Sequence, residues 1–304
     1  MKPDICIYHA PCADGFGAAW AVWKKFPDIV FHPGVHGEPP PDVAGKNVVL
    51  VDFSYKRDVL VNMLRSGDAR QAMTILILDH HKTAQEDLAG ICEPEDGVYA
   101  PDQWRAKWEQ EVEWPGRAVF DMARSGAQIA WDFFHPGEPR PKLIDYVADR
   151  DLWKFDLPHS RAVASWVFSY PYRFVTWEEM ARQIESPMYF RGVVDQGTAI
   201  ERKHQKDIKE LVAQTRRIMV IGGQSVPVAN LPYTYASDAA GEMAATAPFA
   251  ACYFDRADGQ RVFSLRSRGI NGADVSAIAA GYGGGGHKNA AGFQMPLGWK
   301  GDKS

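Results

Sequence analysis

Three consecutive titratable residues, Asp79, His80 and His81, stand directly after the apolar run "MTILIL" (73–78). The run is typical of a buried strand, which usually ends in turn-forming or helix-capping residues. Carboxylate and imidazole side chains are also the ligands that several divalent metal ions prefer. The stretch therefore raises the hypothesis that a metal site lies at the end of this strand.

Three other segments carry the same residue types near strand ends or turns, namely "YHAPCADG" (8–15), "VDFS" (51–54) and "ADRDLWKF" (148–155). Taken singly, an Asp after a strand is more often a helix cap, and a lone His is more often a hydrogen-bonded residue. Clustered carboxylates, however, resist ionising together unless a cation neutralises them. The segments together predict a divalent-cation site, with Mn²⁺ expected and Mg²⁺, Co²⁺ or Zn²⁺ as alternatives.

The first eighty residues alternate short apolar runs with amphipathic helical patterns, which is typical of a parallel sheet covered by helices on both faces. In such sheets ligands bind beyond the carboxyl ends of the strands. Because Tyr8, His9, Asp52 and Asp79–His81 end the predicted strands, we expect them to meet at one edge. The predicted strands are 5–8, 47–53 and 73–81, and the predicted helices are 15–26 and 56–67.

Helical patterning resumes at 118–134 and 141–155, after an acidic, tryptophan-rich excursion at 93–117. We interpret the excursion as a lid. Its tryptophans either stack bases or serve as packing and cover residues; they are Trp104, Trp108 and Trp114.

Beyond residue 195 the pattern changes. A long charged helical stretch, 197–220, precedes apolar runs typical of antiparallel strands, and "RADGQR" (256–261) between two of them fits a hairpin turn. We therefore predict an α/β protein with two domains. The parallel-sheet domain is placed at 1–195, a connecting helix at 196–217 and a smaller α/β domain at 218–304.

Composition narrows the function classes. The 304 residues carry a net charge of −4, which argues against long duplex nucleic acid as a partner, because such binding needs a broad basic surface. The four cysteines form no C-x-x-C pair, so we expect no disulfide framework and a reducing cytoplasm. No apolar stretch approaches the roughly eighteen residues of a membrane span, so no membrane association is expected.

The motif "LDHHKT", with upstream "HAPCADG" and "VDF" and downstream "GGGGHKNAAGF", resembles the DHH phosphoesterase superfamily. The arrangement is similar to its DHH–DHHA1 branch, which contains RecJ-like nucleases, nano-RNA hydrolases and cyclic-dinucleotide phosphodiesterases. The resemblance implies a metal-binding DHH catalytic domain, a substrate-binding DHHA1 domain and an active site in the cleft between them.

The resemblance implies a set of metal ligands. Asp52 matches the carboxylate that bridges two metal ions, and Asp14 matches a ligand of the first motif. His9 belongs to that same motif, and His80 matches the metal-binding histidine of the triplet. Two divalent ions, most readily Mn²⁺, are therefore the implied cofactors.

The same resemblance implies roles for three more residues. "DLWKF" is similar to the fourth motif of the family, which favours Asp151 over Asp149 as its ligand. His81 would act in catalysis either by contacting the metal ligands, without binding an ion itself, or by contacting the phosphate. Asp79 would support the imidazoles.

The first motif departs from the commonest family pattern, His-x-x-x-Asp-x-Asp. Cys12 stands where a second carboxylate is expected, and His9 is one residue closer to Asp14. A thiolate ligand at Cys12 would shift the metal preference toward zinc or cobalt. Alternatively, Cys12 is a small buried residue and one metal position is weaker. Both interpretations stay open.

The tail "GYGGGGHKNAAGF" (281–293) contains four consecutive glycines, which are costly in chain entropy and unexpected in a core sheet. Such a run suits a backbone that approaches a ligand closely and directs its N–H groups at an anion; the alternative is a flexible linker. The run resembles the GGGH motif of DHHA1 domains. The residues implied to hold the substrate are Gly284, Gly285, Gly286 and His287.

"FSLRSRG" (263–269) resembles the arginine strand that accompanies this motif. On a strand, Arg266 and Arg268 point to one face and Ser267 to the other. Paired guanidinium groups match phosphate oxygens, so both arginines are predicted substrate ligands, with Arg266 ranked first.

The implied function is two-metal hydrolysis of short oligonucleotides, or of linear or cyclic dinucleotides, to 5′-mononucleotides. The implied partner is thus a short nucleotide substrate; whether the chain forms a homodimer stays open. One alternative is a phosphomonoesterase that acts on a nucleotide such as 3′-phosphoadenosine 5′-phosphate. Another is a catalytically silent metal and nucleotide sensor, in which Cys12 disables one metal position.

Overall fold

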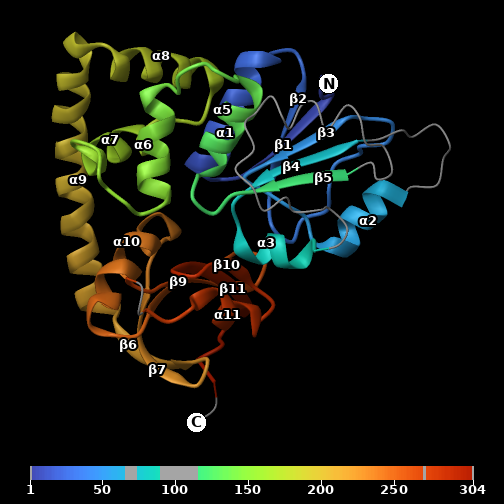
Figure 1. Cartoon of the computed structure of the whole chain (residues 1–304). Helices are drawn as coiled ribbons and strands as arrows, with labels where there is room; N and C mark the ends of the chain where they lie inside the picture. The colour runs from blue at the N-terminus through green and yellow to red at the C-terminus, as the bar shows by residue number, and fades with distance from the viewer. Residues whose placement is uncertain (1, 66–73, 90–115, 270–271, 303–304) are drawn as a thin grey trace. The chain divides into compact units, whose positions relative to one another are not determined.

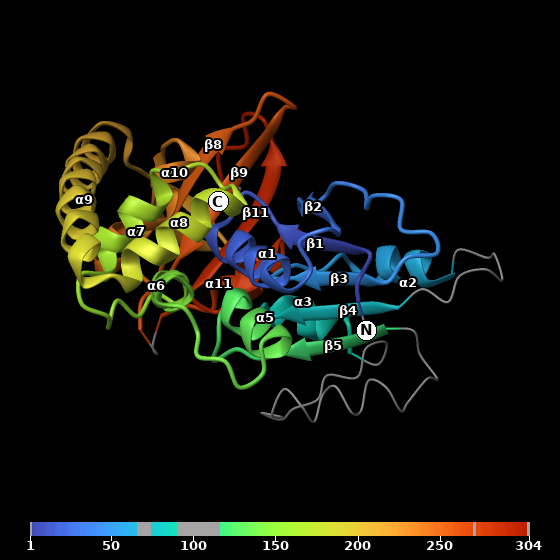
Figure 2. The same cartoon turned by 90° about the horizontal axis from the view of Figure 1, so that it is seen from above.

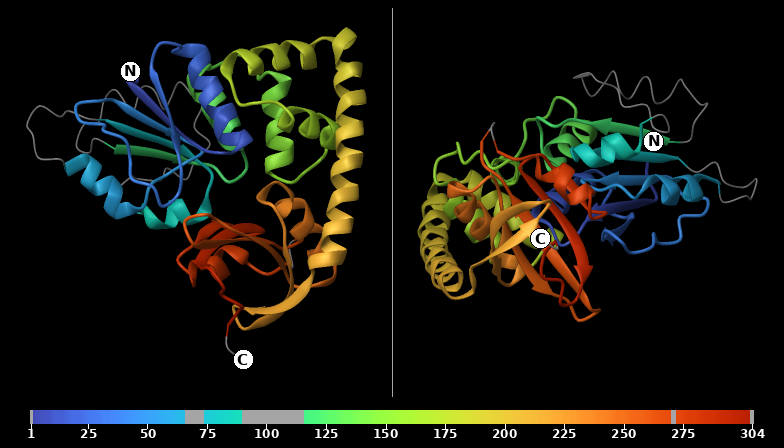
Figure 3. Two further views of the ribbon diagram at one scale, coloured as in Figure 1. Left: turned by 180° about the vertical axis from the view of Figure 1, so that it is seen from behind. Right: turned by 90° about the horizontal axis from the view of Figure 1, so that it is seen from below.

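The structure is a computed structural model that describes residues 2–65, 74–89, 116–269 and 272–302. The chain divides into two compact units, Met1–Glu201 and Arg202–Ser304, and helix α9 (Pro187–Thr215) runs through the division. Figure 3 shows α9 as one continuous helix. The excursion predicted at 93–117, with its three tryptophans, lies outside the described residues except for its last two.

The first unit is built on a five-stranded sheet in the order β2-β1-β3-β4-β5, in which every neighbouring pair is parallel, as the sequence predicts. Figure 2 shows the strands side by side. The order reverses between β1 and β3, and ligands of such sheets bind beyond the carboxyl ends of strands at this point. The strands are β1 (Ile5–His9), β2 (Val30–Gly34), β3 (Val48–Val51), β4 (Ile75–Asp79) and β5 (Gly116–Phe120).

Alternate side chains of each strand enter two different cores, because successive residues of a strand point to opposite faces. Helices therefore cover both faces of the sheet (Figure 1). One core joins Cys6, Val49 and Leu76 to helices α1 (Ala13–Lys25) and α5 (Gly126–Phe134). The other core joins Ile7, Leu50 and Ile77 to helix α2 (Arg57–Arg65).

Two strands differ from the sequence prediction. Residues 118–120, predicted as the start of a helical pattern, belong to β5 instead, and β2 was not predicted at all. A short apolar run does not distinguish a strand from a buried helix by period alone, which explains the error at β5. Strand β2 contains Pro33 and an exposed Val30, as an edge strand allows, and so lacks the apolar pattern of its neighbours.

Further helices complete the first unit. Helix α6 ends at Asp151, so the helical pattern predicted over 141–155 stops four residues earlier than expected. Side chains of α6, α7 and α8, including Ile144, Trp166 and Trp177, extend the core around α1 and α5. The bounds are α3 (Lys82–Asp87), α6 (Lys142–Asp151), α7 (Ser160–Phe168) and α8 (Phe174–Glu185).

The second unit has a six-stranded sheet in the order β10-β11-β9-β8-β7-β6, antiparallel except for the β7–β8 pair. The hairpin predicted at 256–261 joins β8 to β9. Helices α10 and α11 pack in two separate apolar clusters, α11 with Phe263 and α10 with Cys252. The elements are β6 (Arg217–Ile221), β7 (Gln224–Asn230), α10 (Tyr233–Met243), η1 (Ala244–Thr246), β8 (Ala250–Asp255), β9 (Gln260–Arg266), α11 (Val275–Ala280), β10 (Gly285–His287) and β11 (Ala290–Pro296).

The helix predicted at 197–220 is α9, which begins ten residues earlier and ends at Thr215 before strand β6. Among the described residues, no helix is both long enough and apolar enough to cross a membrane.

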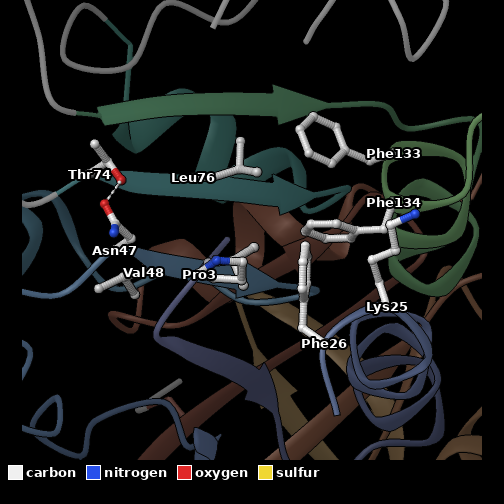
Figure 4. A pocket seen from close by; sticks show the side chains of 10 residues that line it. Pro3, Lys25, Phe26, Asn47, Val48, Thr74, Leu76, Phe133 and Phe134 are labelled. Carbon is white, nitrogen blue, oxygen red and sulfur yellow. Dashed lines mark hydrogen bonds between the residues drawn. The ribbon is translucent and has the colours of Figure 1, made fainter. Parts of the chain in front are cut away.

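A pocket opens at the amino ends of the strands in the first unit, where Val48 begins β3 and Thr74 precedes β4 (Figure 4). The side chains of Phe26, Phe133 and Phe134 form much of its wall. The residues predicted to bind metal lie instead at or beyond the carboxyl ends of the strands, so this pocket is separate from that site.

Candidate metal centre

The sheet brings three of the predicted residues to one edge. His9 ends β1, Asp52 directly follows β3 and Asp79 ends β4. The register pairs Tyr8 with Val51, and Val51 with Leu78, so these three strands end side by side. The expectation that strand-end polar residues meet at the carboxyl edge is therefore met.

His80 stands at the centre of a group of carboxylates. Its Nε2 atom lies 3.1 Å from Oδ1 of Asp52, 3.6 Å from Oδ2 of Asp14 and 3.6 Å from Oδ2 of Asp151. Two ligand atoms that are each about 2.1 Å from one ion lie about 3.0–3.4 Å apart at ordinary coordination angles. The Asp52 spacing falls in this range and the other two exceed it by 0.2 Å, so small shifts of these side chains would let all four serve as ligands of one divalent ion.

Asp52 belongs to two groups of ligand-type atoms. One atom each from Asp14, Asp52 and His80 lie within 4.8 Å of one another, and so do one atom each from His9, Asp52 and His81. In the second group, His9 Nδ1 is 3.3 Å from Asp52 Oδ2, and His81 Nδ1 is 4.0 Å from Asp52 Oδ1. A single carboxylate thus connects two potential ion positions.

The backbone holds Asp52 in an uncommon conformation. Its φ is 53°, in the left-handed region, where a non-glycine residue is strained but Asp is among the better tolerated. A Cβ atom added at Gly126 would lie only 2.4 Å from Cβ of Asp52. Position 126 must therefore be glycine for the first turn of α5 to pack this closely against Asp52.

Asp14 is fixed by the same turn. Its Oδ2 accepts a hydrogen bond of 2.6 Å from the Gly126 N–H, and its Oδ1 accepts one of 3.1 Å from the Ala127 N–H. Helix N-termini favour negative charge through their unpaired N–H groups. The sequence analysis missed this partner, although Ser125 and Gln128 form a capping box whose S-x-x-Q pattern marks a helix start.

Asp79 organises the turn after β4. Its Oδ1 lies 2.7 Å from the ring Nδ1 of His81 and accepts hydrogen bonds from the backbone N–H groups of His80 (2.7 Å) and His81 (3.3 Å). With Nδ1 as the donor, Nε2 is the unprotonated nitrogen of a neutral His81 ring. Asp79 thus contacts the His81 ring and the backbone of the turn, and its supporting role in catalysis stays a prediction.

Asp149 and Asp151 take different places. The Asp149 side chain accepts hydrogen bonds from the N–H groups of Asp156 (2.9 Å) and Leu157 (3.2 Å), which fold the loop after α6. Asp151 instead reaches His80. The structure therefore places Asp151 at the candidate site and Asp149 in the supporting loop.

Cys12 precedes α1 as its N-cap residue and makes no side-chain capping hydrogen bond there. Burial raises the pKa of its thiol, an effect that hydrogen bonding to His9 and the charge of that ring partly offset. The thiol thus lies beside a candidate ligand, but it belongs to none of the groups of three ligand atoms found among the described residues.

The electrostatics of the cluster depend on burial and on the imidazoles. Burial and the neighbouring Asp52 and Asp151 carboxylates raise the pKa of Asp14 well above its usual value. Burial alone would also raise the pKa of Asp52, but the His80 and His9 rings hold it well below that value. Buried carboxylates this close together need positive charge, so the acidic and imidazole groups are able to bind divalent metal.

His36 is a further residue at this edge that the sequence analysis did not single out. Its ring centroid lies 5.2 Å from that of His9 and 4.8 Å from that of Phe53. His36 is exposed to solvent, and the His9 and His81 rings nearby contribute to lowering the pKa of its imidazole. The surrounding segment "FHPGVHGEPP" matches no motif and offered no signal for this placement.

In the second unit, both predicted arginines lie against α10. Arg266 Nη2 donates to Ser237 Oγ at 2.6 Å and Nη1 donates to the Leu265 carbonyl at 2.8 Å, while Arg268 Nε donates to the Gly241 carbonyl at 2.5 Å. The Ser267 Oγ accepts a hydrogen bond from Asn289 at 2.8 Å. Strand β9 ends at Arg266, so Ser267 and Arg268 lie beyond the strand on which the alternation was predicted.

The glycine run has a structural reason that the sequence analysis did not anticipate. Strand β10 contains Gly285, Gly286 and His287 and lies at the sheet edge beside β11. A Cβ atom at Gly284 would lie 2.0 Å from the Gly292 carbonyl oxygen, and one at Gly286 would lie 2.6 Å from that of Ala290. Close approach to the β11 backbone therefore requires glycine at two of these positions, whatever ligand the run binds.

No family model matches the chain. An uncharacterized protein of Acanthamoeba polyphaga mimivirus is 26% identical over 314 residues, which cover 95% of this chain and 67% of that protein. Among solved structures, the pGpG-specific phosphodiesterase PggH from Vibrio cholerae is 14% identical with a TM-score of 0.43, over 96% of this chain and 93% of that one. RecJ from Thermus thermophilus in complex with Mg²⁺ is 15% identical with a TM-score of 0.42, over 97% of this chain and 47% of that one.

A DHH domain described as belonging to a family of ribosomal proteins is 14% identical with a TM-score of 0.45, over 97% of this chain and 83% of that one. The chain is thus similar to solved DHH-domain proteins. At these identities and TM-scores, the family resemblance rests instead on the motifs of this sequence and on the grouping of Asp14, Asp52 and His80.

Proposed function

We propose that the chain is a metal-dependent phosphodiesterase of the DHH–DHHA1 type. Its substrates are short oligonucleotides, or linear or cyclic dinucleotides, and its products are 5′-mononucleotides. The observation that supports this most strongly is the position of Asp52, which shares ligand-type atoms with two groups of residues at one sheet edge. A carboxylate common to two groups would allow two ions to lie close together, as they do in two-metal phosphoesterases.

The donor set suits two divalent ions. Asp14, Asp52, His80 and Asp151 would hold one ion, and His9 and Asp52 would hold the second, with His81 beside them. When bound, such ions polarise the phosphoryl group and lower the pKa of water. Mn²⁺ is the ion we propose, because it accepts both carboxylate and imidazole ligands.

The side chains of the chain itself supply the remaining parts of the reaction. The oxygen of water forms a bond to phosphorus, and the bond from phosphorus to the leaving 3′-oxygen breaks. His81, oriented by Asp79, would take a proton from the water through its Nε2 atom and pass that proton to the leaving 3′-oxygen.

The preference for short substrates rests on charge. A net charge of −4 leaves little attraction for a long polyanion, whose binding needs many phosphate contacts. In the second unit, the side chains of Arg266 and Arg268 both lie against α10. We propose Arg266, Arg268, His287 and the N–H groups of Gly284–Gly286 as the phosphate ligands of this unit.

The proposal is tested by turnover of the purified chain with Mn²⁺. The substrates are 5′-pApA, a cyclic dinucleotide, an RNA of about 24 nucleotides and 3′-phosphoadenosine 5′-phosphate. We expect faster release of AMP from pApA than from the long RNA. Release of phosphate from the bisphosphate alone would indicate a phosphomonoesterase, and tight binding without products would indicate a sensor; either result would contradict the proposal.

A further inference from the structure

The loop "DLWKF" (151–155) holds two large aromatic residues in a costly backbone conformation. Trp153 has φ 58° and Phe155 has φ 56°, both in the left-handed region. This conformation costs about 1–2 kcal/mol for a residue with a Cβ atom, and glycine would avoid that cost. If only the path of the chain mattered here, aromatic side chains would be a poor choice at both positions.

Asp149 maintains this conformation from the end of α6. Its carbonyl accepts the N–H groups of Lys154 at 2.9 Å and Phe155 at 3.3 Å. Its buried carboxylate accepts the N–H groups of Asp156 and Leu157. The loop is thus fixed by four hydrogen bonds to a single residue, so the strained conformation belongs to the fold.

Neither aromatic ring serves the core of the first unit. Trp20 and Trp177, which help to build this core, are at most 1% exposed. Trp153 and Phe155 are only half-buried, and among the described residues neither joins the hydrophobic clusters nor packs against them. Core packing therefore does not explain why these two residues are aromatic.

The two rings belong to the loop that leaves helix α6 at Asp151, a candidate metal ligand. Trp153 is two residues beyond Asp151, whose carboxylate lies 3.6 Å from His80. The rings of Trp153 and Phe155 meet edge to face, with centroids 5.2 Å apart at an angle of 76°. Cationic groups accompany both rings, since Arg150 Cζ lies 4.2 Å from the Trp153 centroid and Arg161 Cζ lies 3.7 Å from that of Phe155.

We propose that this aromatic and arginine surface binds a nucleobase of the substrate, with Trp153 as the stacking residue. Half-exposed aromatic rings beside arginines bind bases by stacking, independently of sequence, because every base has a π-face. The inference rests on the proposed function and adds specificity to it. The chain would then select phosphodiesters that carry a base over phosphodiesters that do not.

The test compares two substrates with the full chain and Mn²⁺. One is 5′-pApA, and the other is the same 5′-phosphorylated dinucleotide backbone with tetrahydrofuran units in place of both nucleosides. For Trp153→Gly, which tolerates the left-handed backbone, we expect kcat/KM on pApA to fall about tenfold, mainly through KM. For the same variant, kcat/KM on the abasic substrate should change less than about twofold, and Trp153→Phe should keep most of the wild-type kcat/KM on pApA. The matched control is Lys154→Ala, at the exposed position between Trp153 and Phe155 in the sequence. It should leave kcat/KM unchanged on both substrates.

Equal losses on both substrates would overturn the inference, because they would show that Trp153 only positions Asp151. If the wild-type chain hydrolyses neither substrate, the proposed function fails, and calorimetric titration with AMP then tests the surface alone. Weaker AMP binding by Trp153→Gly, with wild-type binding by Lys154→Ala, would support a base site. Identical AMP binding by wild type and Trp153→Gly, or none by the wild type, would contradict it.

Discussion

Adding one methyl group at Gly126, which is not a metal ligand, should disable the metal centre. A Cβ atom at this position would lie 2.4 Å from Cβ and 2.8 Å from Oδ1 of Asp52. Ordinary contact begins at 3.4 Å, so relief of the overlap requires a displacement of about 1 Å. Asp52 cannot absorb this easily, because its backbone already lies in the left-handed region.

The expected size of the effect follows from that displacement. Overpacking of this kind lowers the free energy of unfolding by about 1–3 kcal/mol, and a misplacement of about 1 Å at a reacting centre costs about a hundredfold in rate. Alanine is a better helix former than glycine, so α5 itself is not weakened. We therefore expect Gly126→Ala to stay folded while its Mn²⁺ affinity falls at least about tenfold and its turnover about a hundredfold.

The assay combines calorimetric Mn²⁺ titration, turnover of pApA and thermal unfolding. Gly192→Ala in α9 is the matched control, since a Cβ atom there meets nothing within 4 Å. It should leave Mn²⁺ affinity and turnover unchanged. Wild-type affinity and rate in Gly126→Ala would refute the reasoning, because they would show that the position of Asp52 against α5 does not matter.

Three further predictions follow from the site. His80→Ala should abolish turnover, because the imidazole lies next to three carboxylates of the candidate metal site, and the circular dichroism spectrum should stay unchanged. A normal rate of this variant in metal-stripped buffer would contradict the prediction. Ser237→Ala should raise KM about threefold with little change in kcat, because the serine hydroxyl accepts a hydrogen bond from Arg266. Thr234→Ala, on the exposed side of α10, should leave both KM and kcat unchanged. Cys12→Asp should raise activity or shift the preference from zinc toward manganese if the position faces the ions; identical metal profiles would show that the thiol is only a packing residue.

Much of the sheet was predictable because burial leaves a simple pattern. Strands β1, β3 and β4 are central and apolar, so their runs end clearly at His9, Asp52 and Asp79. Strands β2 and β5 lie at the two edges, where the pattern is weaker. One was missed, and the other was assigned to a helix.

The candidate ligands were predictable from motifs, but their supports were not. Asp14 accepts hydrogen bonds from the N–H groups of Gly126 and Ala127. These partners follow it by 112 and 113 positions in the sequence, so no local pattern reveals the contact. The backbone angles of Asp52 and Trp153 likewise depend on tertiary packing, because a positive φ is uncommon for any residue other than glycine.

The most direct test of the account counts the metal ions that the chain binds. With Mn²⁺ alone, calorimetry and elemental analysis should find about two ions per wild-type chain. Asp52→Asn should lose both ions, because Asp52 is common to the two groups, whereas His9→Ala, which removes a ligand from one group, should lose one. If Asp52→Asn retained both ions with wild-type affinity, the claim that this carboxylate joins two metal positions would be wrong.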